Sequence, residues 1–183
     1  MASKSPARRQ TLDHLSQTYG FTLEFIESGF PEDLPKEGLS ALEYVKRTAK
    51  GKLDCITSQY VVITGDTIIV RDGVILEKPA SKEEAMSWFK SYRCIDCISV
   101  AWIREGDKQE CIAETSKIYF RENLTEDQIE GYFEAMPSYK DKAGAIDIDE
   151  CISRGMIEGS ISQGDLHCIH GFPLSSFKSL IEK

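Results

Sequence analysis

Residues 60–70 read YVVITGDTIIV. A nearly continuous apolar run of this length is typical of a β-strand that is buried on both faces. One charged side chain, Asp66, interrupts the run within the segment Thr64–Thr67. An ionised carboxylate there is costly unless it is paired, bound to a metal or at the solvent edge. Asp66 is therefore a candidate general base or magnesium ligand, and the alternative is a simple strand end or bulge at Gly65–Thr67.

Helix signals flank this strand on both sides along the chain. Ser5-Pro6 is an N-cap followed by proline at the first helical position, and Gly20 ends that helix. Two capping boxes, Ser81-x-x-Glu84 and Thr125-x-x-Gln128, each precede a helical pattern. The predicted helices cover residues 6–19, 41–55, 83–92, 126–136 and 174–180.

Strand patterns occupy most of the remaining chain. Asp72-Gly73 is a hairpin turn signal, and a polar turn at Gly106-Asp107 joins two further strands. The predicted strands cover residues 21–27, 60–70, 74–79, 94–103 and 110–120, with short strand-like pieces in the final third. These elements predict an α/β protein with a mixed central sheet flanked by helices, folded as one domain over residues 1–183 with two lobes.

Composition excludes several classes of function. The 183 residues carry 22 Lys and Arg against 30 Asp and Glu, a formal charge of −8. A generic polyanion binder needs a basic surface, so nucleic acid is not an expected partner. No apolar run approaches the 18 residues of a membrane span, and the first ten residues lack the apolar core of a secretory signal. We expect a cytoplasmic protein.

The six cysteines and three histidines do not indicate a metal centre. Cys94 and Cys97 lie in a predicted strand, where an odd spacing points the two thiols to opposite faces. The same parity argument applies to His167 and His170 if that segment is extended. Buried thiols and structural or surface histidines are the better interpretation.

Cations near the chain start indicate phosphate binding. Arg8 and Arg9 fall in the first turn of the predicted helix, where the helix dipole disfavours a positive charge. A bound phosphate would satisfy both the dipole and the guanidinium groups, although two solvated arginines are the plain alternative. Further candidate cations are Lys50, Lys52 and Lys78, and a loop holds the acids Glu32, Asp33 and Glu37.

The order of five motifs resembles the Maf-like nucleoside triphosphate pyrophosphatases, also called septum-formation proteins. The motifs are A-S-x-S-P-x-R-R at residues 2–9, T-G-D-T-I-I-V at 64–70, L-E-K-P at 76–79, D-K-A-G-A at 141–145 and G-F-P-L at 171–174. Together they span nearly the whole chain.

The resemblance implies a Maf-like fold, similar to inosine triphosphate pyrophosphatases, with a nucleotide-binding cleft between two lobes. It implies Mg²⁺-dependent hydrolysis of a nucleoside triphosphate to the monophosphate and pyrophosphate, a house-cleaning reaction, by a protein that is often a homodimer. By the same resemblance, Asp66, Lys52 and Lys78 are catalytic and Asp66 and Glu32 hold the metal. Ser3, Ser5, Arg8 and Arg9 are the expected phosphate ligands.

Three positions depart from the family pattern. Only Met1 and Ala2 precede Ser3, where the family usually has a short apolar strand. Ala7 replaces a common arginine, and Asp149 stands where the pyrimidine-nucleotide branch carries a glutamine. Asp149 is therefore an uncertain site residue that adds negative charge.

Asp66-Thr67 and D-K-A-G resemble the branch that acts on dTTP and UTP, which are the favoured substrates, with modified nucleotides as the alternative. A 7-methyl-GTP or other nucleotide specificity, or a non-catalytic nucleotide-binding regulator of cell division, are the competing hypotheses.

Overall fold

The computed structural model describes residues 1–3, 5–31, 34–158 and 166–182. Four strands form one sheet in the order β2-β1-β3-β4: β1 (Val62–Arg71), β2 (Val74–Leu76), β3 (Cys94–Glu105) and β4 (Lys108–Tyr119). β1 and β2 pair antiparallel, with Val70 opposite Ile75, across the predicted turn in which Asp72 and Gly73 have positive φ. Ala2 makes parallel bridges to Thr64 and Ile26, which makes the pairing mixed as predicted.

The chain divides into two compact units, and the three long strands contribute residues to both. Unit 1 comprises Met1–Thr67, Ile98–Glu114 and Asp165–Lys183, and unit 2 comprises Ile68–Cys97 and Thr115–Gly164. Unit 1 holds α1 (Pro6–Tyr19), α2 (Ala41–Asp54), α6 (Leu166–Ile169) and α7 (Leu174–Ile181). Unit 2 holds α3 (Lys82–Ser91), α4 (Glu126–Ala135), α5 (Ile148–Ser153) and the 3₁₀ turns η1 (Pro137–Asp141) and η2 (Ala143–Ala145).

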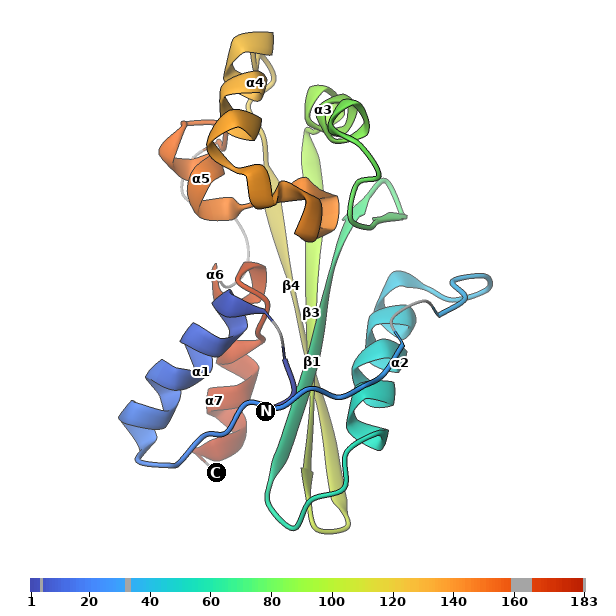
Figure 1. Cartoon of the computed structure of the whole chain (residues 1–183), viewed down its shortest axis with the longest axis vertical. Coiled ribbons are helices and arrows are strands. Elements are labelled where there is room, and N and C mark those ends of the chain that lie inside the picture. Colours follow the sequence, from blue (N-terminus) through green and yellow to red (C-terminus); the bar gives the residue numbers. More distant parts are fainter. Residues whose placement is uncertain (4, 32–33, 159–165, 183) are drawn as a thin grey trace. The chain divides into compact units, whose positions relative to one another are not determined.

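In unit 1, β1 is covered on both faces, as its apolar sequence predicts. Figure 1 shows α1 and α7 on one side of the strand and α2 on the other. Ile63 packs with Leu12 and Phe177 of the first layer, whereas Val62 packs with Leu53 at the end of α2. Because side chains alternate along a strand, the odd-numbered residues of β1 up to Thr67 face α1 and the even-numbered ones up to Asp66 face α2.

Unit 2 has a core of aromatic rings. Phe89 of α3 lies 4.7 Å from Tyr132 and 5.0 Å from Phe133 of α4, measured between ring centroids. The Tyr132 hydroxyl donates to the carbonyl of Ala145 at 2.8 Å and accepts from the backbone N–H of Asp147 at 2.7 Å. Burial raises the pKa of Tyr132 well above its ordinary value, so the ring stays neutral.

The cap signals located the helices correctly. Ser5 accepts from the backbone N–H of Arg8, Gly20 ends α1 with φ 72°, and Thr125 and Gln128 form a full capping box. The box at Ser81 is only half formed, because Glu84 accepts from the N–H of Ala80 instead of Ser81.

Two predicted strand regions are wrong. Residues 21–27 hold only the isolated bridge at Ile26, whose N–H donates to the carbonyl of Met1, because among the described residues this segment pairs with none of the four strands. The final third is helical at α5 and α6, with one isolated bridge between Phe120 and Ile157. His167 therefore lies on a helix and not on a strand, so the parity argument for the two histidines does not apply.

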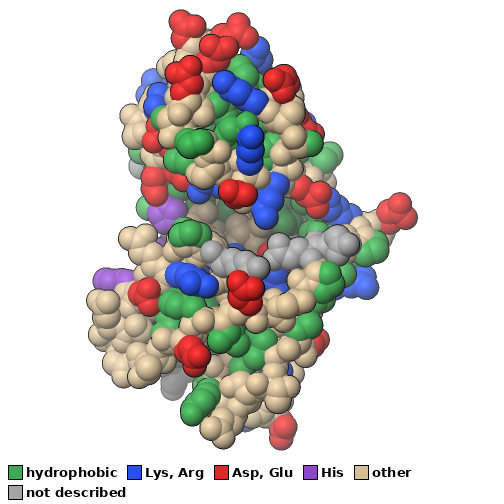
Figure 2. Space-filling model, in the orientation of Figure 1, with side chains coloured by type: hydrophobic (Ala, Val, Ile, Leu, Met, Phe, Trp, Pro, Cys, Tyr) green, Lys and Arg blue, Asp and Glu red, His purple; other side chains and the backbone are tan. Residues whose placement is uncertain are grey.

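Charged side chains of both signs are interspersed over the face of the molecule in Figure 2. All six cysteines are free thiols, and Cys97, Cys151 and Cys168 are buried. Among the described residues no helix has both the length and the apolar content that a membrane span requires.

Candidate functional site

Asp66 lies in the middle of β1 and pairs with Lys52 of α2. The Lys52 Nζ atom donates to Asp66 Oδ1 at 2.9 Å, with the two side chains 8% and 18% exposed. β1 continues unbroken through Gly65–Thr67, so the strand does not end at Asp66. The charge that interrupts the apolar strand is thus neutralised by a lysine on the covering helix, as a buried carboxylate requires.

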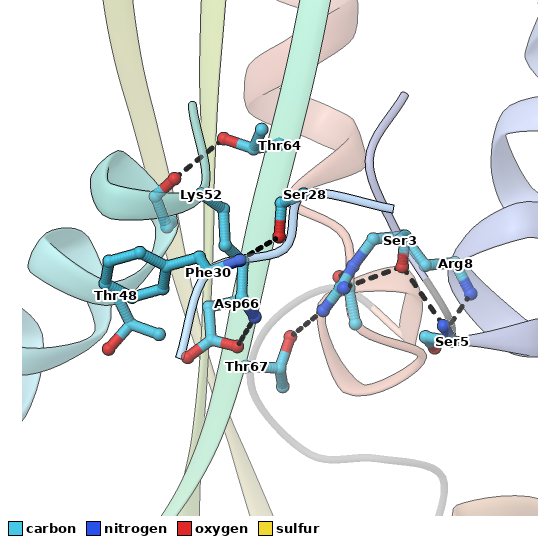
Figure 3. A network of polar contacts seen from close by, with 12 residues as sticks. Ser3, Ser5, Arg8, Ser28, Phe30, Thr48, Lys52, Thr64, Asp66 and Thr67 are labelled. Atoms are coloured by element: carbon cyan, nitrogen blue, oxygen red, sulfur yellow. Dashed lines mark hydrogen bonds and ion pairs between the residues drawn. The ribbon is translucent and has the colours of Figure 1, made fainter. Parts of the chain in front are cut away.

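Lys52 reaches this position because it belongs to the buried stripe of α2. Val45, Ala49 and Leu53 of that helix are fully buried, and Lys52 itself is 7% exposed. Thr64, two residues before Asp66 on the same face of β1, donates to the carbonyl of Ala49 at 2.8 Å and fixes the helix against the strand. Figure 3 shows Lys52 and Asp66 pointing toward each other from the two elements.

Arg8 occupies the equivalent position on the opposite face of β1. It lies on the buried stripe of α1 with Leu12 and Leu15 and is 7% exposed. Its Nη1 donates to Ser3 Oγ at 3.0 Å, its Nη2 to Thr67 Oγ1 at 3.1 Å and its Nε to the carbonyl of Gly171 at 2.6 Å. The guanidinium is thereby held by three neutral oxygens (Figure 3 shows Ser3, Thr67 and Arg8 together).

Ser3 and Ser5 surround the start of α1. Ser3 Oγ accepts from Arg8 Nη1 and, at 3.1 Å, from the backbone N–H of Ser5. These two bonds use both lone pairs of the hydroxyl, which leaves its hydrogen to be donated. Ser5 Oγ caps α1 by accepting from the N–H of Arg8 at 3.3 Å. The pair forms a donor-rich turn at the positive end of a 14-residue helix, which is suited to an acceptor-only ligand such as phosphate.

Two glycines make room for the Arg8 guanidinium. A Cβ at Gly65 would lie 3.0 Å from the carbonyl oxygen of Val100 and 3.4 Å from Arg8 Nε. Gly171, with φ 96°, has Arg8 Nη2 and Thr67 Oγ1 each 3.4 Å from the position its Cβ would take. The G-D-T and G-F-P-L motifs therefore supply close backbone approach to Arg8, which explains why each begins with glycine.

Sequence reasoning missed the residue that supports Thr67. Ser99 of β3 is fully buried, and its Oγ lies 2.8 Å from Thr67 Oγ1 and donates to the carbonyl of Cys168 at 2.6 Å. Ser99 sits inside an apolar strand sequence, where a small buried serine is unremarkable. Only the pairing of β1 with β3 reveals its neighbour.

Of the other predicted ligands of unit 1, only Arg9 contacts the turn at Ser3 among the described residues. Arg9 Nε donates to the carbonyl of Ser3 at 2.8 Å, and its guanidinium lies 4.9 Å from the centre of the Phe25 ring, so Arg9 braces the turn at Ser3. Lys50 pairs with the exposed Asp54 of its own helix. Glu32 and Asp33 lie outside the described residues.

Lys78 and Asp149 belong to unit 2, and both are exposed. The neighbouring carbonyl of Glu77 accepts from the N–H of Gly144 at 2.9 Å, which joins the L-E-K-P turn to the D-K-A-G-A segment. Asp149 lies in the first turn of α5, whose N-cap is Asp147. The Asp147 carboxylate also pairs with Lys142 at 2.9 Å.

The donor set for a metal is small but suitable. Among the described residues no group of three or more His, Cys, Asp and Glu side chains could enclose a metal ion. Asp66 supplies one partly exposed carboxylate. Mg²⁺ on a nucleotide commonly takes one or two carboxylates together with substrate phosphates and water, so a single carboxylate fits that mode of binding.

A family model described as Maf-like protein matches residues 1–183. The chain belongs to the Maf family. The dTTP/UTP pyrophosphatase of Vibrio vulnificus (strain YJ016) is 30% identical to this Maf-family chain over 191 residues, covering 100% of the chain and 96% of the relative. The dTTP/UTP pyrophosphatase of Pyrococcus furiosus is 32% identical and covers 100% and 93%.

The Maf-family chain also shares its fold with a solved structure. A HAM1 protein from Coxiella burnetii aligns with a TM-score of 0.50 and 15% sequence identity, covering 99% of this chain and 96% of that one. Together with the sheet described above, this likeness confirms the predicted α/β fold.

Proposed function

We propose that this Maf-family chain is a nucleoside triphosphate pyrophosphatase, which hydrolyses its substrate to the nucleoside monophosphate and pyrophosphate. The observation that carries the proposal is the arrangement at Asp66 and Thr67. These consecutive residues of β1 hold Lys52 on one face and Arg8 on the other. A carboxylate, an ammonium group, a guanidinium group and a serine donor thus gather around one short stretch of strand.

The inventory suits attack on phosphorus. The reaction breaks the anhydride bond between the α- and β-phosphates while a water oxygen bonds to the α-phosphorus. Its transition state carries negative charge on the phosphoryl oxygens, so catalysis consists mainly of positioning and charge neutralisation. Arg8, the Ser3 hydroxyl and the start of α1 supply donors to phosphate oxygens. Asp66 would orient the attacking water or accept its proton.

We further propose Mg²⁺ as the cofactor, held by Asp66 and, as the family resemblance implies, by Glu32. When bound, the ion would neutralise phosphate charge. In this structure the Lys52 ammonium group forms an ion pair with the Asp66 carboxylate. With a metal on the carboxylate, the Lys52 ammonium group would be available to a phosphate oxygen. Lys78 remains a predicted phosphate ligand on the same resemblance.

dTTP and UTP are the proposed substrates. The printed names of the relatives from V. vulnificus and P. furiosus support this choice, as do Asp66-Thr67 and the D-K-A-G-A segment of this chain. The departure at Asp149, an exposed acid, keeps modified nucleotides as the alternative. The six free thiols support a reducing compartment, so we place the protein in the cytoplasm. We expect a homodimer, as the family resemblance implies.

A substrate panel tests the proposal. The protein is incubated with Mg²⁺ and dTTP, UTP, CTP, GTP, 7-methyl-GTP or inosine triphosphate, and the products are separated by anion exchange. We expect dTMP or UMP with one equivalent of pyrophosphate. Release of a nucleoside diphosphate and inorganic phosphate would contradict the proposed cleavage between the α- and β-phosphates. Turnover of none of these triphosphates would favour the non-catalytic regulator. A panel repeated with Asp149→Gln shows whether that acid shifts the preferred base.

A further inference from the structure

A chain of two hydroxyl groups, of the half-buried Thr67 and the buried Ser99, connects Arg8 to Cys168 of α6, just before the turn that leads to α7. Arg8 Nη2 bonds to Thr67 Oγ1, Thr67 Oγ1 to Ser99 Oγ, and Ser99 Oγ to the carbonyl of Cys168, at 3.1, 2.8 and 2.6 Å. All four residues lie in unit 1. Gly171 of the same turn accepts directly from Arg8 Nε.

The direction of each hydrogen bond in this chain follows from counting hydrogens. A hydroxyl has one hydrogen to donate. Ser99 uses its hydrogen on the carbonyl of Cys168, which can only accept, so the hydrogen between the two hydroxyls must come from Thr67. Thr67 then has only lone pairs left for Arg8, and the Arg8 N–H donates to them. The carbonyl of Cys168 thus determines, through Ser99, that the Thr67 hydroxyl turns its lone pairs and not its hydrogen toward the guanidinium.

We propose that Ser99 is a positioning residue for the phosphate-binding arginine. Through Thr67 it holds the Arg8 guanidinium in the plane and position from which the arginine binds a phosphate group. The inference rests on the proposed function, because it assigns Ser99 a part in binding the triphosphate. Ser99 itself is fully buried and contacts no ligand.

Removing the Ser99 hydroxyl has two local consequences. The carbonyl of Cys168 loses the Ser99 donor and keeps the N–H of Gly171 at 3.0 Å, and Thr67 loses the acceptor that directs its hydrogen. Thr67 is then able to rotate and turn its hydrogen toward Arg8, which has only donors to offer. Arg8 would keep its bonds to Ser3 and Gly171 but lose its fixed orientation at Nη2.

The test is steady-state kinetics of Ser99→Ala with dTTP, together with titration of pyrophosphate by calorimetry. Losing the support of one hydrogen bond is worth about 1 kcal/mol, or about a fivefold change. We expect KM and the Kd for pyrophosphate to rise about five- to tenfold, with a smaller fall in kcat. Ser116→Ala is the matched control, because Ser116 is an equally buried serine on β4 in unit 2. Its KM should equal that of the wild type.

A double-mutant cycle separates positioning from a general loss of stability. In an Arg8→Lys background the guanidinium that Ser99 orients is gone, so Ser99→Ala should change KM by less than twofold. Additive effects in the cycle, or a wild-type KM and pyrophosphate affinity in Ser99→Ala, would overturn the inference. Absence of turnover by the wild-type protein would instead contradict the proposed function, while the pyrophosphate titration would still test Ser99.

Discussion

Lys52 donates to Asp66 at 2.9 Å, so the carboxylate that interrupts the central strand and a lysine of the helix covering it form one ion pair. The two residues are 14 positions apart, and each is the charged member of a buried surface of its element that is otherwise apolar apart from threonines. The pair neutralises the Asp66 charge without substrate. Lys52 and Asp66 should therefore act as a unit, both in stability and in catalysis.

Changing Lys52 to methionine should expose this coupling. The variant keeps the length of the side chain but leaves Asp66 with its charge unneutralised in a largely buried place. We expect it to be destabilised at pH 7 by about 1–3 kcal/mol, which is below the cost for a fully buried pair because Asp66 is partly solvated. Urea denaturation measures this loss. In an Asp66→Asn background Lys52→Met should cost less than 1 kcal/mol, and equal costs in both backgrounds would show that the pair is not coupled.

Gly51, next to Lys52 on α2, should tolerate alanine only when Phe30 is absent. A Cβ at Gly51 would lie 2.3 Å from Phe30 Cζ, so the ring must move. Overpacking of this kind costs about 1–3 kcal/mol, whereas alanine favours a helix interior over glycine by about 1 kcal/mol. Gly51→Ala should therefore destabilise the wild type and stabilise the Phe30→Ala variant.

The predicted change in stability at Gly51, which reverses its direction when Phe30 is removed, has a matched control in α4. Gly131→Ala places a Cβ only near the flexible end of Arg154, at 3.1 Å, and should stabilise the protein. Thermal denaturation of the four variants measures the effect. If Gly51→Ala changes the melting temperature in the same direction with and without the Phe30 ring, the ring does not occupy the space beside Gly51.

Asp147 should make unit 2 sensitive to acid. Burial opposes ionisation of Asp147, but hydrogen bonds from Lys142 and from the backbone N–H groups at the start of α5 outweigh it, and the pKa of Asp147 is lowered from 3.8. A carboxyl whose pKa is lowered by folding stabilises the protein above its unfolded-state pKa, and this contribution disappears as the pH falls through the folded-state pKa. We expect Asp147→Asn to be about 1 kcal/mol less stable than the wild type at pH 7.

That difference between Asp147→Asn and the wild type should shrink toward zero below pH 3, as measured by urea denaturation at a series of pH values. Asp141→Asn, altered at an exposed carboxylate nearby, is the control and should follow the wild-type profile. A difference that is constant from pH 7 to pH 2.5 would show that the Asp147 charge is not the cause.

Local signals predicted the parts of the fold that depend on local interactions. Caps at Ser5, Ser81 and Thr125 placed three helices correctly because a cap is made by residues close in sequence. The pattern of residues 21–27 looked like a strand, but strand formation requires a partner, and among the described residues Ile26 forms only an isolated bridge with Ala2. The helices α5 and α6 have six and four residues, too short for a periodic pattern to be read.

The candidate site was predicted where a charge breaks an apolar pattern. Asp66 stood out on its strand, and Arg8 and Lys52 each lie on the buried stripe of a helix, a signal that can be read from the spacing to Leu12 and Val45. Ser99 could not be found in this way. Its role depends on which residue of the neighbouring strand lies beside it, and that register is set by the folded sheet.

We propose that Asp66 serves hydrolysis of a nucleoside triphosphate at this site. The most direct measurement is pyrophosphate release from dTTP and UTP with Mg²⁺ by the wild type and by Asp66→Asn, with the melting temperature of both proteins recorded in parallel. We expect turnover by the wild type and a loss of at least about 100-fold in kcat for a folded Asp66→Asn variant, as is usual when a general base is removed. Equal turnover by the two proteins would show that Asp66 is not a catalytic residue.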